Sequence, residues 1–88
     1  GGNGLYILDE PEAALSPMRL MTLMCEIDRL VKLDSQFIIA THSPFLLSMA
    51  GAKIYDLDDE QVSVKKWTEL GNVRHYYEFF KEHEDEFE

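Results

Sequence analysis

The N-terminal half of the chain contains two short, unbroken apolar runs, at residues 5–8 and 37–40. Continuous runs of this length predict strands covered on both faces, as in parallel sheets. Between them, apolar residues recur at spacings of three and four over 18–31, which predicts a helix with a broad apolar face. A Ser-Pro pair at 16–17 predicts its start, and an Asp-Ser pair at 34–35 its end. Strand, helix and strand in this order imply a right-handed parallel crossover.

The C-terminal half has weaker periodicity. A second Ser-Pro pair at 43–44 predicts a short helix, and 52–57 reads as a third strand. Residues 62–65 alternate apolar and polar, which predicts a half-exposed strand that forms a hairpin with the third. Asn72 is the expected cap of a last helix, and 82–88 is expected to be an acidic, disordered tail. The predicted fold class is α/β, with parallel strands, crossover helices, a C-terminal β-hairpin and a terminal helix.

Length and charge limit the possible functions. A chain of 88 residues is one small domain at most, over 1–88. Its net charge of −9 argues against nucleic-acid contact from this segment, because phosphate binding requires clustered Lys and Arg. The single cysteine, Cys25, cannot form an internal disulfide and is expected to be a buried thiol in a reducing compartment. The sequence contains no apolar stretch long enough for membrane insertion, so we expect a cytoplasmic protein.

Two adjacent carboxylates, Asp9 and Glu10, follow the first apolar run. Neighbouring strand side chains point to opposite faces, so both can serve one site only where the strand ends, as Pro11 enforces. Ligands of open parallel sheets bind at the carboxyl ends of the strands, where His42 also falls. Alternatively, the two carboxylates cap a turn without chemistry, and His42 is a structural histidine. The Gly-rich segment 1–4 lacks the Lys and Ser or Thr of a phosphate-binding loop.

The segments LYILDEPEAALSP and FIIATHSP, in this order, resemble the Walker B strand, D-loop and H-loop of ABC-type ATPases, in particular the soluble AAA and ABC-like group. The resemblance covers 5–57 and implies the C-terminal part of a P-loop NTPase-like nucleotide-binding domain. It implies that Asp9 supports Mg²⁺ through water, that Glu10 is the catalytic carboxylate beside the attacking water, and that His42 contacts the γ-phosphate. All three would then bind ATP and Mg²⁺ in the intact protein.

The same resemblance implies that a D-loop, Pro11 to Pro17, crosses to a second ATPase protomer. The sequence departs from the transporter pattern, because Ser16 and Pro17 stand where a loop Asp is usual. Walker A, the Q-loop and the signature motif lie upstream in the family, so we expect these 88 residues alone to be inactive and to bind no nucleotide tightly. Without the Walker A strand, a gap of about 9.6 Å, two strand spacings, would remain in the sheet. We expect the third strand to rearrange into this gap, or self-association to fill it.

Three functions are compatible with these residues. The first is the C-terminal portion of an ABC-type ATPase, a hydrolase that converts ATP to ADP and phosphate in the intact protein. The second is a non-catalytic interaction module that self-associates and does not bind ATP alone. The third, a receiver-like regulator with an acidic Mg²⁺ pocket, requires a Lys after a buried strand, and the sequence has none at that place.

Overall fold

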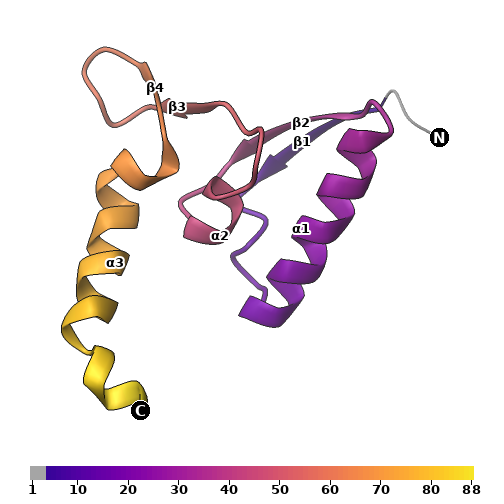
Figure 1. Cartoon of the computed structure of the whole chain (residues 1–88). Coiled ribbons are helices and arrows are strands. Elements are labelled where there is room, and N and C mark those ends of the chain that lie inside the picture. Colours follow the sequence, from indigo (N-terminus) through magenta and orange to yellow (C-terminus); the bar gives the residue numbers. More distant parts are fainter. Residues whose placement is uncertain (1–3) are drawn as a thin grey trace. The chain divides into compact units, whose positions relative to one another are not determined.

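The computed structural model describes residues 4–88 (Figure 1). The backbone forms two compact units, the first ending at Met49 and the second beginning at Ala50. That 1–88 is one partial nucleotide-binding domain stays a prediction. Each unit is described by itself below. Residues 1–3 of the Gly-rich segment lie outside the described residues.

The first unit contains two parallel strands, joined through a helix, and a short second helix. Its elements are β1 (Leu5–Asp9), α1 (Pro17–Lys32), β2 (Gln36–Ala40) and α2 (Pro44–Leu47). Leu5 pairs with Gln36 and Asp9 with Ala40, so the two strands run in register from end to end. The parallel pair with its connecting helix is the predicted arrangement, and each strand is one residue longer than its apolar run.

Local signals set both ends of α1. The Ser16 hydroxyl accepts a hydrogen bond from the Arg19 backbone N–H at 3.3 Å, and Pro17 occupies the first turn, as predicted. At the other end Asp34 adopts a left-handed backbone with φ of 68°. The Asp34 N–H donates to the Val31 carbonyl and the Ser35 N–H to the Leu30 carbonyl, both at 3.0 Å. This is a Schellman motif, which explains why the helix stops at the predicted Asp-Ser pair.

Within residues 4–49 of the first unit, helices cover one face of the β1–β2 pair. Leu20 and Ile27 of α1 are buried with Leu46 of α2. Partly buried side chains pack around this core: Leu8, Leu15, Leu23, Met24, Phe37, Ile39 and Met49.

The opposite face of the pair is open. Leu5 is 60% exposed, Ile7 72% and Ile38 54%. The predictions that the strands are covered on both faces and that Cys25 is buried are therefore wrong for this chain, in which Cys25 is exposed. Apolar area of this extent favours burial, so the open face is a surface suited to contact with further polypeptide.

The second unit begins with a hairpin and ends in a helix. Its elements are β3 (Ile54–Asp56), β4 (Ser63–Lys65), the 3-10 turn η1 (Trp67–Glu69), α3 (Gly71–Glu82) and the 3-10 turn η2 (Glu84–Phe87). β3 and β4 pair antiparallel, as predicted, although β3 is shorter than the predicted 52–57. The Lys65 ammonium lies 2.8 Å from the Asp56 carboxylate across the hairpin. This hydrogen bond, with a second from the Asp58 backbone N–H, lowers the pKa of Asp56.

The last helix does not begin where the sequence indicated. Leu70 is its N-cap, and the Arg74 N–H donates to the Leu70 carbonyl at 3.0 Å. Asn72 lies inside the helix instead of capping it. The preceding 3-10 turn, closed by Glu69, brings the chain into helical geometry earlier than a side-chain cap at Asn72 would. The acidic segment 82–88 begins as the last residue of α3 and continues as η2.

The third strand does not pair with either strand of the first unit, so the predicted rearrangement of this strand into the β1–β2 sheet is not observed among the described residues. Within residues 4–88, β1 pairs with β2 and β3 with β4, in two separate sheets. Self-association of the open face remains a prediction. In the part of the chain that the structure describes, no helix is long and apolar enough to cross a membrane.

Candidate functional site

The parallel register brings the ends of β1 and β2 to the same edge of the pair. Asp9 is the last residue of β1 and lies opposite Ala40, the last residue of β2. The Glu10 backbone N–H donates to the Ala40 carbonyl at 2.7 Å, so the ladder continues one residue beyond the strand. The loops that carry Glu10 and His42 therefore leave the sheet side by side.

Glu10 has an unusual backbone. Its φ is 45°, in the left-handed region that residues with a side chain rarely adopt. The strand thus ends at Asp9, and Pro11 follows in a turn. This is the predicted strand end that allows Asp9 and Glu10 to serve one site. A left-handed backbone costs a residue with a side chain about 1–2 kcal/mol, and strain of this kind is concentrated at functional sites.

The structure brings together two of the three predicted site residues. Glu10 Oε1 lies 3.5 Å from His42 Nδ1, and the side chains are 58% and 67% exposed. Solvent screens a pair this exposed, so it contributes little to stability. Both side chains are free to turn towards a ligand at the strand ends.

A third carboxylate connects the two loops. Glu12 Oε2 accepts a hydrogen bond from the His42 backbone N–H at 3.4 Å. Its other oxygen, Oε1, is buried and has no hydrogen-bond partner among the described residues. No role was predicted for Glu12 from the sequence. The sequence feature that could have indicated a role is a third acidic residue in the DEPE string. This residue lies in a loop that follows β1 and runs near the end of β2.

The segment from Pro11 to Pro17, predicted as a D-loop, is a compact turn. The Ala13 N–H donates to the Glu10 carbonyl at 3.1 Å, and the Leu15 N–H donates to the Glu12 carbonyl at 3.0 Å. Leu15 packs against the core and anchors the loop before α1 begins. Contact of this loop with a second protomer remains a prediction.

Asp9 is exposed at the strand end, where its carboxylate can hold a water shared with a cation. Residues 4–88 contain no group of three His, Cys, Asp or Glu side chains able to hold a metal ion by themselves. This donor set does not form a protein cage. It does fit Mg²⁺, which keeps several waters and binds through one or two carboxylates together with substrate phosphates.

A parallel strand pair connected by a helix, with acidic residues at its carboxyl end, is the arrangement of a P-loop-like α/β fragment. The comparison with protein families agrees. Residues 1–48 match the family described as "AAA domain, putative AbiEii toxin, Type IV TA system", and this match spans more than half of the 88 residues. The chain belongs to this family, and its first unit is a fragment of a P-loop ATPase domain of the AAA type. Comparisons with curated proteins and with solved structures gave no match.

Proposed function

We propose that the first unit forms the Mg²⁺ and γ-phosphate side of an ATP site in an ABC-type ATPase. The observation that carries this proposal is the 3.5 Å approach of Glu10 Oε1 to His42 Nδ1 at the carboxyl ends of two parallel strands. The family match over 1–48 supports the coarser class. The phosphate-binding loop would come from polypeptide outside these 88 residues.

Each residue has a distinct role in the proposed mechanism. Bound Mg²⁺ would neutralise charge on the β- and γ-phosphates, and Asp9 would hold it through water. Glu10 would accept a proton from the attacking water. Because His42 turns Nδ1 towards Glu10, its Nε2 would be the nitrogen that donates to a γ-phosphate oxygen. Glu12 would position the loop that carries His42 by accepting the hydrogen bond from the His42 backbone N–H.

The test uses the intact protein that contains this chain. Glu10→Gln keeps the size of the side chain and removes its basicity. Loss of a general base lowers turnover by roughly 10²–10⁴-fold, so ATP hydrolysis should fall by this factor while ATP binding persists. Glu26→Gln, on the exposed surface of α1, is the matched control and should leave hydrolysis unchanged. Equal turnover in the two variants would reject Glu10 as the base.

The open face of the β1–β2 pair favours a second candidate, a self-associating module that does not bind ATP alone. Leu5, Ile7 and Ile38 form this open face. Light scattering after size exclusion should then detect a dimer of the 88-residue chain, which Ile7→Lys disrupts and Met18→Lys, at an exposed position of α1, does not. A monomer at all concentrations would reject the module. Calorimetry with MgATP on the 88-residue chain adds a one-sided test. Absence of binding would fit both candidates, whereas heat of binding would imply a reconstituted ATP site and reject the second.

A further inference from the structure

The second unit exposes a group of aromatic side chains that neither the family match nor the proposed ATP site uses. Half or more of each residue is exposed, from 51% at Phe80 to 73% at Phe87. We call this group the aromatic face; it comprises Tyr76, Tyr77, Phe79, Phe80 and Phe87 of α3 and η2. In the remainder of α3 only Val73 is buried, so the helix uses little of its apolar surface within this unit.

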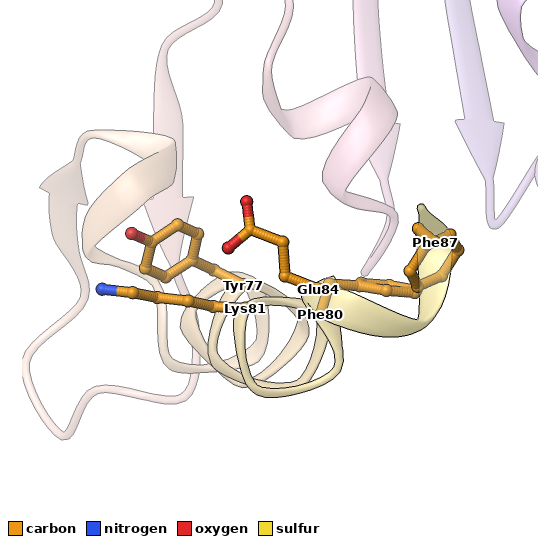
Figure 2. Close-up of a pocket in the computed structure, with 5 residues that line it drawn as sticks. All are labelled: Tyr77, Phe80, Lys81, Glu84 and Phe87. Carbon is orange, nitrogen blue, oxygen red and sulfur yellow. The ribbon is translucent and has the colours of Figure 1, made fainter.

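Two shallow grooves flank Phe80. The larger has a volume of about 630 Å³ and is lined by Tyr77, Phe80, Lys81, Glu84 and Phe87 (Figure 2). The smaller, of about 310 Å³, is lined by His75, Tyr76, Phe79 and Phe80. Phe80 contacts Phe79 and Phe87 edge to face, with ring centroids 5.4 and 6.0 Å apart. Phe80 therefore lines both grooves and separates them.

The size of the aromatic face is that of a binding surface. At the exposures given above, five aromatic side chains present roughly 500 Å² of apolar surface, which is at the upper end for a monomer. Aromatic residues at the centre of a patch with a polar rim are the usual anchors of protein interfaces.

Charge identifies the kind of occupant. Within 71–88 two basic side chains, Arg74 and Lys81, stand against six acidic ones, a net charge of −4 with His neutral. The acidic residues are Glu78, Glu82, Glu84, Asp85, Glu86 and Glu88. In Figure 2 the Glu84 carboxylate extends along the larger groove beside Tyr77. The Tyr77 ring has Arg74 and Lys81 at 5.9 and 5.7 Å from its centroid, so its contacts with cations are made within the chain.

We propose that the aromatic face binds a basic amphipathic helix of a partner protein. Its apolar side chains would fill the two grooves on either side of Phe80, and its Lys and Arg side chains would lie against the acidic rim. A second copy of this chain carries the same negative rim and would be repelled, and an anionic membrane would be repelled for the same reason.

The experiment measures binding to the 88-residue chain by fluorescence anisotropy. The probe is a labelled 16-residue peptide with Leu and Trp at helical spacing i, i+3, i+4, i+7 and Lys elsewhere, and its partner has every Lys replaced by Glu. We expect the Lys peptide to bind at least about tenfold more tightly, and added salt to weaken it. Phe80→Ala should weaken binding by about tenfold or more, since it removes the side chain that separates the grooves.

Two controls keep the result interpretable. Phe45→Ala removes an aromatic side chain of similar exposure, 41%, from α2 in the first unit and should leave binding unchanged. Glu84→Lys alters the rim without touching an aromatic residue and should weaken the Lys peptide but not the Glu peptide. Equal binding of the two peptides, or no effect of Phe80→Ala, would overturn the proposal. So would a dimer that Phe80→Ala dissociates, or tighter binding to phosphatidylserine vesicles than to the Lys peptide.

Discussion

The left-handed backbone of Glu10 gives a test of the site that needs no nucleotide. Glu10→Ala and Glu10→Gly both remove the carboxylate, so the contact with His42 is lost equally in both. They differ in the cost of φ 45°, which for an L-residue is about 1–2 kcal/mol and for Gly is close to zero. The greater freedom of Gly in the unfolded chain offsets about 0.4–1 kcal/mol of this gain. Glu10→Gly should therefore be more stable than Glu10→Ala by about 1 kcal/mol.

Two further positions calibrate the comparison. Asp34 has φ of 68° at the end of α1, far from the candidate site in sequence, and Gly should again exceed Ala by about 1 kcal/mol. Glu26 lies within α1, where Gly should instead be less stable than Ala by about 1 kcal/mol. The sign of the difference thus reports the backbone conformation of each residue.

Amide hydrogen exchange of β1 and β2 measures the stability of the first unit alone. A difference of 1 kcal/mol changes the exchange rate about fivefold, so the amides of Glu10→Gly should exchange about fivefold more slowly than those of Glu10→Ala. Trp67 fluorescence reports on the second unit and should not distinguish the pair. The Asp34→Gly and Asp34→Ala variants serve as the reference pair. If they differ as expected but the strand amides of Glu10→Gly exchange no more slowly than those of Glu10→Ala, the inference that Glu10 has a strained, left-handed backbone is wrong.

Two other outcomes follow from the contacts. Glu12→Ala removes the acceptor of the His42 N–H, a hydrogen bond of about 1 kcal/mol, so the His42 amide should exchange about fivefold faster. Glu12→Gln keeps a side-chain oxygen and should retain part of the protection. An unchanged exchange rate in Glu12→Ala would contradict the link between the two loops. The lowered pKa of Asp56, caused first by the Lys65 hydrogen bond, contributes stability that is present above the ordinary value of 3.8 and is lost as pH falls through the lowered value. The free energy of unfolding can be measured with urea and Trp67 fluorescence. Between pH 5 and pH 2 it should fall more in the natural chain than in Lys65→Met. Equal losses would show that the Asp56–Lys65 pair does not contribute to stability.

The sequence by itself determined the elements whose causes are local. The Ser-Pro pair and the Asp-Ser pair that bound α1 act through hydrogen bonds within five residues, so their meaning does not depend on the rest of the fold. The hairpin of the second unit also follows from neighbouring residues. The cap at Asn72 was mispredicted because a 3-10 turn, in which the Glu69 carboxylate accepts a hydrogen bond from the Lys66 backbone N–H, precedes the helix, which then starts at Gly71.

The candidate site was predictable in part. The apolar runs and the DEP string predict that Asp9, Glu10 and His42 lie at one edge of the sheet, because the carboxyl ends of parallel strands share an edge. The roles assigned to these three residues remain predictions. The bond between Glu12 and His42 joins residues 30 positions apart, and no local pattern predicts such a partner.

Only the tertiary structure decided which apolar surfaces are buried. The sequence determined that 5–8 and 37–40 are strands with apolar side chains on both faces, and it predicted a candidate site at their ends. The fold buries one face under α1 and α2 and leaves Leu5, Ile7 and Ile38 open. Periodicity reports that a face is apolar, whereas burial depends on what else is present to cover it.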